Sequence, residues 1–420
     1  MPKKQIYLDH AATTPVRSEV LKAMLPYFTK NFGNASAIHT VGQIANGALN
    51  DARRTIAGII HALPDNIIFT SGGTESNNLA IFGVTKAVLN LTLPSPLWRR
   101  GFDASSSFTN EEAGGGLARG HIITTAIEHD SVLRPFGHLA KQGWDVTFVP
   151  VDKHGRVNPQ DVIRAIRPET VLISVMYANN EIGTIEPIAD IGRMILRYRK
   201  KHNTQHPYFH TDACQAAGYL DLDVEKLHID LMTINASKIY GPKGVGLLYV
   251  RRGVKLEPLM FGGSQEHALR PGTENVAGIV GLGIALALSQ KETYRDKEIR
   301  RLRQLSEYFW KELQKKIPGV KFNGPEIGED RLPNNLNVEF PEIEGETLLL
   351  YLNEAGIMCS TSSACGLESS EPSHVLQAIG CNTSSMRSSV RFTLGQGTTK
   401  DEINYTVRTI AKLQSLLPKS

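Results

Sequence analysis

The chain has 420 residues, which is enough to bury a large core and to divide into two domains. Its 46 basic and 42 acidic side chains nearly cancel, so it lacks the charge excess of a dedicated nucleic-acid binder. No apolar run is long enough to span a bilayer, and the N-terminal stretch MPKKQIYLDH is unlike a signal peptide. The four cysteines show neither zinc spacing nor a CxxC pair. We therefore expect a cytoplasmic protein without a metal site, a membrane partner or a direct nucleic-acid partner.

Strands and helices alternate through the first part of the chain. Apolar runs predict strands near residues 6–9, 66–70, 121–126, 145–151, 171–177, 208–212, 231–236 and 246–250. Helical spacing predicts helices near 18–30, 42–61, 131–142, 159–166 and 187–201, and others that begin after Thr70 and near Ala213. This alternation predicts an α/β fold with a doubly wound, mainly parallel sheet.

The remainder of the chain has a different pattern. A long helical pattern over 276–316, in two pieces, precedes strands near 335–340 and 389–394 and helices near 345–355, 373–379 and 399–417. We predict a large domain over 15–275 and a smaller α+β domain over 1–14 and 276–420. Proline, glycine and serine cluster in residues 91–119, which we interpret as an exposed insertion.

Two charged residues mark one edge of the predicted sheet. Asp212 ends a strand, and Lys238 follows the next strand on a glycine-bounded turn. Open α/β sheets bind ligands at this edge, and a lysine beside a carboxylate suits a pyridoxal 5'-phosphate (PLP) site. In such a site the lysine bonds to the cofactor and the aspartate pairs with its ring nitrogen. The pair alone also fits a helix N-cap and a solvated loop lysine, so both interpretations stay open.

Three further features could carry chemistry. Gly73 and Thr74 stand at a helix start, where free N–H groups form either a phosphate seat or a plain cap. Cys365 lies among small polar residues, as a reactive thiol or an incidental surface cysteine. Arg391 lies in an apolar strand and needs an anion, either a substrate carboxylate or an intramolecular ion pair.

These stretches together resemble the cysteine desulfurases of the class V (fold-type I) PLP-dependent enzymes. The matching motifs are YLDHAATTP, FTSGGTESNNLAI, EHDSVL, NNEIGTIEPI, HTDACQAAG, KIYGPKGVGLLYVRRG, RPGTENV, SSACGLESSEPSHVL and SVRFTLGQGTT. They occur in family order from residue 7 to about 400, so the resemblance covers nearly the whole chain apart from 91–119.

The resemblance implies a fold-type I PLP-dependent transferase that converts L-cysteine to L-alanine and leaves the sulfur as a persulfide on an enzyme cysteine. Lys238 would hold PLP, His129 would stack on its ring and assist proton transfer, and Cys365, on a loop of the small domain, would accept the sulfur. The implied cofactor contacts are Gly73, Thr74, His129, Asn180, Asp212, Gln215, Asn235, Ser237, Lys238 and Thr273. Thr273 would come from a neighbouring subunit, which implies a homodimer. The implied substrate contacts are Arg391, Asn34 and Asn180.

Some positions depart from the family pattern. Asn235 stands where serine or threonine is usual, Ser237 where histidine is usual, and Gln396 where arginine is frequent. The alternatives are a selenocysteine lyase, another class V enzyme, or a degenerate non-catalytic subunit of a sulfur-transfer assembly. Cys365 argues against a simple transaminase, and the presence of Lys238, Asp212 and His129 argues against a degenerate subunit. The expected protein partner is a sulfur acceptor, such as an iron–sulfur scaffold or a tRNA-thiolation relay.

Overall fold

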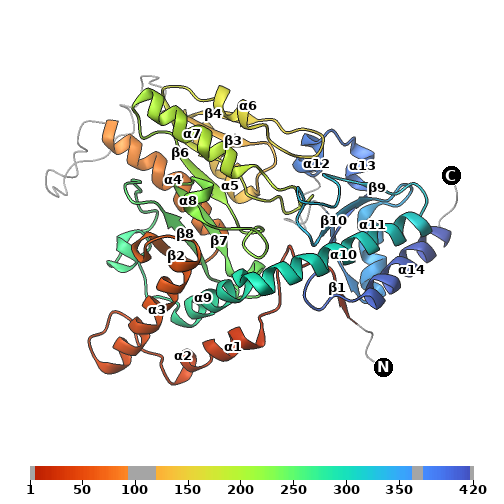
Figure 1. Ribbon diagram of the computed structural model, residues 1–420, viewed down its shortest axis with the longest axis horizontal. Helices are drawn as coiled ribbons and strands as arrows, with labels where there is room; N and C mark the ends of the chain where they lie inside the picture. The colour runs from red at the N-terminus through yellow and green to blue at the C-terminus, as the bar shows by residue number, and fades with distance from the viewer. Residues whose placement is uncertain (1–4, 93–119, 362–371, 417–420) are drawn as a thin grey trace, which may run out of the picture.

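The computed structural model describes residues 5–92, 120–361 and 372–416. Of the predicted insertion at 91–119, only the first two residues are described, at the end of a helix, and Cys365 lies outside the described residues. A large body built on one sheet lies beside a smaller body, and a long helix passes from one to the other (Figure 1).

The large body is built on a seven-stranded sheet with the order β2-β8-β7-β6-β5-β3-β4. The strands are β2 (Ile67–Thr70), β3 (His121–Thr125), β4 (Asp145–Val149), β5 (Thr170–Ser174), β6 (Tyr208–Asp212), β7 (Leu231–Asn235) and β8 (Gly246–Val250). β8 runs antiparallel to β2 and β7, whereas the pairs among β3 to β7 are parallel. The predicted mainly parallel sheet is therefore confirmed.

Helices cover both faces of this sheet. They are α1 (Ser18–Met24), α2 (Pro26–Thr29), α3 (Thr40–Ile59), α4 (Gly73–Thr92), α5 (Asp130–Lys141), α6 (Pro159–Arg164), α7 (Ile188–His202), α8 (Val224–Leu227) and α9 (Val276–Gln290). Neighbouring strand residues point to opposite faces, so Ile123 packs in the core beneath α3, α7 and α9, while Ile122 packs with α4 and α5. Burial on both faces explains why the strands read as continuous apolar runs.

The smaller body is an α+β layer, as predicted. It has a sheet of β12 (Ser360–Thr361), β13 (Ser389–Thr393), β10 (Asn335–Glu339) and β9 (Lys321–Phe322), and a separate pair of β1 (Ile6–Tyr7) with β11 (Ile357–Met358). Its helices are α10 (Glu292–Lys316), α11 (Gly345–Glu354), α12 (His374–Ala378), α13 (Thr383–Arg387) and α14 (Lys400–Leu416). Phe309 of α10 meets Phe392 of β13 edge to face, with ring centroids 5.2 Å apart. Ile6 and Leu8 are buried in the same core, so the start of the chain belongs to this body.

The structure corrects two element predictions. The helix expected from Ala213 is wrong, because residues 214–219 form turns, and the amide of Gln290 donates to the carbonyls of Ala217 and Leu220 at 2.7 and 3.0 Å. The helix expected over 18–30 is divided at Leu25, where Pro26 begins α2.

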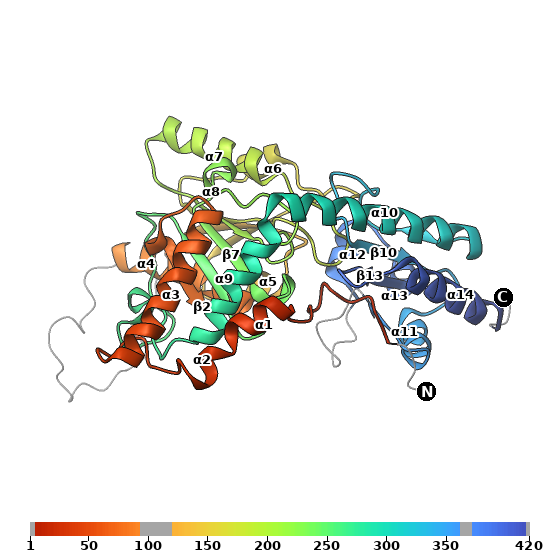
Figure 2. The ribbon, with the colours of Figure 1, turned by 60° about the horizontal axis from the view of Figure 1, so that its bottom comes forward.

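The two helical pieces over 276–316 belong to different cores. α9 packs in the core of the large body, whereas α10 packs in the core of the small one (Figure 2). The domain limits at 14/15 and 275/276 stay a prediction, and this packing favours a boundary at the junction between α9 and α10.

Candidate active site

A cavity of about 280 Å³ opens where the carboxyl ends of β6 and β7 face β13 of the small body. Most of the residues singled out from the sequence line it: Gly73, Thr74, His129, Asn180, Asp212, Gln215, Asn235, Lys238 and Arg391. These residues are up to about 320 positions apart in the chain and meet because parallel strands end at one edge of the sheet.

Lys238 lies on a short 3₁₀ turn, Ala236–Lys238, directly after β7. Its Nζ donates to the carbonyl oxygens of Ala11 and Ala12, at 2.8 and 2.6 Å. Burial lowers the pKa of the Lys238 ammonium, and the Arg391 guanidinium lowers that pKa further. Within the described part of the chain, no carboxylate forms an ion pair with Lys238, although Asp9 and Asp212 act to raise its pKa. The net lowering of the pKa eases loss of the Lys238 proton.

Asp212 is the last residue of β6 and is buried. Its Oδ2 accepts from Nδ2 of Asn77 at 2.7 Å, and its Oδ1 accepts from the N–H of Cys214 at 2.9 Å. Two neutral donors from different elements thus fix the orientation of the carboxylate toward the cavity.

His129 caps the N-terminus of α5. Its Nδ1 accepts from the N–H of Ser131 at 3.0 Å, so the neutral ring carries its proton on Nε2. Burial lowers the pKa of His129, which favours that neutral form. Asn77 donates to Oγ of Ser131 at 2.8 Å as well as to Asp212, so one amide links the carboxylate to the histidine cap. Asn77 and Ser131 were not singled out from the sequence, although both lie inside the matching motifs.

The first turn of α4 borders the cavity at the position where the sequence predicts a phosphate seat. Gly72 and Gly73 leave the helix N-terminus open, and Thr74 adds a hydroxyl. A Cβ at Gly73 would lie 2.8 Å from Sγ of Cys214, so glycine is required there. Cys214 lines the cavity and was missed from the sequence, although it lies two residues after Asp212 in the motif HTDACQAAG.

Asn235 and Ser237, which depart from the family pattern just before Lys238, are hydrogen-bonded to each other. Asn235 lines the cavity, and its Oδ1 accepts from both the N–H and Oγ of Ser237 at 3.2 Å. Ser237 is not among the lining residues and instead orients the Asn235 amide. A lysine amine, an oriented carboxylate and an open helix N-terminus surround one cavity, so these residues fit PLP.

Arg391 forms an intramolecular ion pair and also lines the cavity, where the sequence left a choice between such a pair and a substrate carboxylate. Its Nη2 donates to Oδ1 of Asp9 at 2.8 Å, and its Nη1 donates to the carbonyl of Asn180 at 3.1 Å. The guanidinium nevertheless lines the cavity, and its buried Nε has no partner among the described residues. The intramolecular ion pair is therefore present, and donors remain for a further anion.

Not every predicted residue reaches this cavity. Thr273 and Asn34 are exposed and do not line it, and Asn34 accepts the N–H of Ser36 at 2.9 Å. Gln215 lines it while donating to the carbonyl of Ala11 at 3.0 Å. Among residues 5–92, 120–361 and 372–416, no group of three or more histidine, cysteine or acidic side chains could hold a metal ion. No helix in these ranges is long and apolar enough to cross a membrane.

The fold and the site define the class of fold-type I PLP-dependent transferases. The family model for aminotransferase class-V matches residues 6–91 and 112–405. A cysteine desulfurase IscS of Dictyoglomus turgidum is 47% identical over 420 residues, with 99% of this chain and 97% of that protein covered. A cysteine desulfurase IscS of Methanosarcina thermophila is 45% identical, with 98% and 92% covered.

Solved structures agree with these relatives. A NifS-like protein superposes with a TM-score of 0.83 at 33% identity, covering 99% of this chain and all of that one (100%). A structure described as SspA in complex with cysteine has a TM-score of 0.73 at 35% identity and covers 93% of this chain and 99% of that one. The chain belongs to the class V aminotransferase family and, within it, to the PLP-dependent cysteine desulfurases.

The contact between Gly73 and Cys214 predicts a compensating pair of substitutions. Gly73→Ala places a Cβ 2.8 Å from Sγ, and such overpacking costs about 1–3 kcal/mol, so we expect PLP affinity to fall about tenfold. Gly73→Ala combined with Cys214→Ala removes the clash and restores most of the affinity. Absorbance titration of the cofactor-free protein with PLP measures both. Gly47→Ala, whose Cβ meets nothing within 4 Å, is the control and keeps the parent affinity. Parent-like binding by the single Gly73 variant would contradict the packing argument.

Glu128, next to His129, predicts a pH-dependent stability. Burial raises the pKa of Glu128 from 4.5 to about 8, so the folded protein keeps a proton that the unfolded chain loses, and stability falls as pH rises between these values. The neutral Glu128→Gln keeps an acceptor for the hydroxyl of Thr125 and the N–H of Met176. It should therefore abolish the fall in unfolding free energy with pH, which is up to about 1.4 kcal/mol per pH unit. Urea unfolding at about pH 6 and about pH 8 gives the difference. The exposed Glu346→Gln should leave the slope unchanged, and an equal slope in parent and Glu128→Gln would contradict the assignment.

Proposed function

We propose that this cysteine desulfurase performs its reaction in the cavity around Lys238, converting L-cysteine to L-alanine. The observation that carries the assignment is the partly buried Lys238 amine, held on two neutral carbonyls in the same cavity as the oriented carboxylate of Asp212. The names of the relatives support the substrate, and so does the cysteine complex reported for the SspA structure.

The roles of the cofactor contacts follow from their positions. PLP, when bound, supplies the electron sink that weakens the bonds at the substrate Cα. Lys238 holds the cofactor and moves the substrate proton, since its lowered pKa makes a neutral amine available. Asp212 keeps the ring nitrogen charged, and His129 offers its Nε2 proton to the reacting side. The open turn at Gly73 and Thr74 seats the phosphate together with the Asn235 amide.

Substrate binding and sulfur transfer complete the proposal. The spare donors of Arg391 hold the cysteine carboxylate, with Asn180 beside them. Sulfur passes to the thiolate of Cys365 as a persulfide. The substrate Cβ–S bond breaks, its electron pair stays with the carbon, and a proton completes alanine.

A homodimer completes the site. Large apolar side chains are exposed along α1, α2, the loop before α3 and the loop that carries Thr273: Leu21, Leu25, Phe28, Phe32, Ile38 and Phe261. Monomers rarely expose so many, which supports an interface there. The loop with Thr273 is pinned by the buried pair Glu266–Arg53 and by Arg270, which donates to Glu75 at 3.0 Å. Thr273, exposed and outside its own cavity, contacts the phosphate of the neighbouring subunit, and Asn34 approaches the substrate in the same way.

We place the enzyme in the cytoplasm, where it passes sulfur to an iron–sulfur scaffold or a tRNA-thiolation relay. Support comes from the few cysteines, which fit a reducing compartment. We also propose that the large domain binds the cofactor while the small domain carries the loop with Cys365.

If Cys365 accepts the sulfur, its loss should slow the reaction without changing the visible absorbance of bound PLP. The parent, purified with PLP, absorbs visible light and its spectrum changes on addition of L-cysteine. Cys365→Ser keeps both properties but, with a thiol reductant present to release the persulfide sulfur as sulfide, forms sulfide and alanine about a hundredfold more slowly, because it lacks the nucleophile. Burial raises the pKa of the Cys359 thiol, so Cys359→Ser is the matched control and keeps the parent rate. Turnover by Cys365→Ser at the parent rate would make the nucleophile assignment wrong.

The exposed apolar surface predicts the oligomeric state. Light scattering of the parent gives a dimer, whereas Phe28→Glu with Phe32→Glu gives a monomer, because two charges would have to be buried. The monomer also retains PLP less well than the parent. Thr273→Ala stays dimeric and weakens PLP binding alone. A monomeric parent with full turnover would contradict the shared site.

A further inference from the structure

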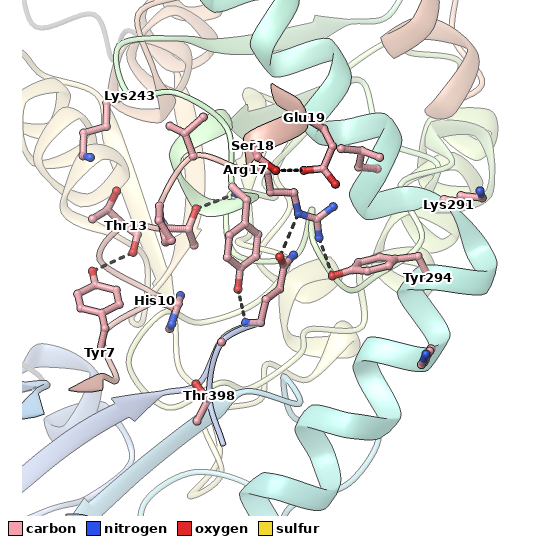
Figure 3. Close-up of a pocket in the computed structure, with 18 of the residues that line it drawn as sticks. Tyr7, His10, Thr13, Arg17, Ser18, Glu19, Lys243, Lys291, Tyr294 and Thr398 are labelled. Carbon is pink, nitrogen blue, oxygen red and sulfur yellow. Dashed lines mark hydrogen bonds between the residues drawn. The ribbon is translucent and has the colours of Figure 1, made fainter. Parts of the chain in front are cut away.

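A second and larger cleft has a volume of about 1110 Å³ (Figure 3). Its walls come from the N-terminal segment between Gln5 and Glu19, the loop Tyr240–Lys243, the start of α10 and the segment 396–402. It shares no lining residue with the active-site cavity. The N-terminal segment separates the two spaces: Ala11 and Ala12 face Lys238, whereas His10 and Thr13 face the cleft.

Arg17 stands in the middle of this cleft and lacks a carboxylate partner. Its guanidinium lies 4.6 Å from the ring centroid of Tyr294 and 5.3 Å from that of Tyr240. It donates from Nε to Oε1 of Gln396 at 3.1 Å and from Nη2 to the hydroxyl of Tyr294 at 2.6 Å. Its other N–H groups have no protein acceptor among the described residues. A half-buried guanidinium held by neutral groups is a ready partner for an anion.

The other charges around the cleft are mostly positive. Lys243, Lys291 and Lys297 line it, and Figure 3 shows Lys243 and Lys291 on opposite sides of Arg17. None of the three lysines forms an ion pair within the described ranges. Burial lowers the pKa of His10 to about 4, so this ring adds no charge at neutral pH.

The two carboxylates of the lining are already used locally. Glu19 accepts from Oγ of Ser18 at 3.0 Å, and Glu402 accepts from the N–H of Thr399 at 3.0 Å at the start of α14. These neutral donors leave both negative charges in place, but the lining has four cationic side chains against these two carboxylates, so an excess of positive charge remains.

The start of α10 adds a second, independent feature. This helix has 25 residues, and its N-cap, Lys291, makes no side-chain cap hydrogen bond. Thr293 and Tyr294 of the first turn line the cleft. The N–H of Tyr294 donates to the carbonyl of Lys291 at 2.9 Å, so what this end of α10 offers an anion is the positive end of a long helix.

We propose that this cleft binds a small organic polyphosphate of nucleotide size. Several cations spread over the cleft require several anionic groups in one ligand, and phosphate oxygens match both the Arg17 fork and the lysine point charges. The volume is that of a pocket for a ligand larger than a single phosphate.

Calorimetric titration of the PLP-saturated, full-length protein with ATP and with inorganic triphosphate tests the proposal. We expect both to bind, with an affinity that falls as salt rises. Lys243→Ala with Lys297→Ala removes two exposed cations without opening a core, and should weaken binding about tenfold or more. Arg17→Gln should weaken it as well. Lys315→Ala with Lys412→Ala, two exposed lysines outside the cleft, is the matched control and should bind as the parent does.

Four results would overturn the proposal. They are no binding of either probe, equal binding by the parent and the Lys243/Lys297 variant, release of PLP by the probes, and binding of poly-glutamate but not of triphosphate. Release of PLP would assign the probes to the phosphate seat, and binding of poly-glutamate alone would assign the cleft to an acidic protein. Thermal unfolding of each variant verifies that it is folded.

Discussion

The arrangement of the active site depends on the fixed carboxylate of Asp212. The amide of Asn77 donates to it from the first turns of α4, and the N–H of Cys214 donates from the turn after β6. Because Asn77 also contacts Ser131, one amide joins α4, the strand that carries the carboxylate and the cap formed by His129. A buried anion with both oxygens engaged keeps its direction, so the cofactor meets a preformed site.

Sequence patterns predict the parts of this site that depend on local order. Asp212 and Lys238 can be found because each follows an apolar run, and the ends of parallel strands meet at one edge. The long, strongly patterned elements, such as α9, α10 and the strands of the large sheet, are predicted for the same reason. Gly73 was selected for its place at a helix start, which needs no knowledge of the fold.

Contacts between distant segments have no such local signal. Arg391 pairs with Asp9 across most of the chain, so the sequence could offer only a choice between a substrate and an internal partner. The crowding of Gly73 by Cys214 joins the start of α4 to the turn after β6, and only the folded chain reveals it. The turns after Asp212 are likewise tied to a distant segment, because the amide of Gln290 donates to the carbonyls of Ala217 and Leu220.

The pairing of β1 with β11 has a consequence for how the protein is made. Ile6 lies beside Ile357, and Leu8 is buried with Phe392, so the first strand finds its partners only among the last elements. During synthesis this strand therefore leaves the ribosome before the large body and stays unpaired until β11 follows. Such a strand is an open edge for wrong pairing throughout that interval. The small body can therefore close only after the large body has been synthesised.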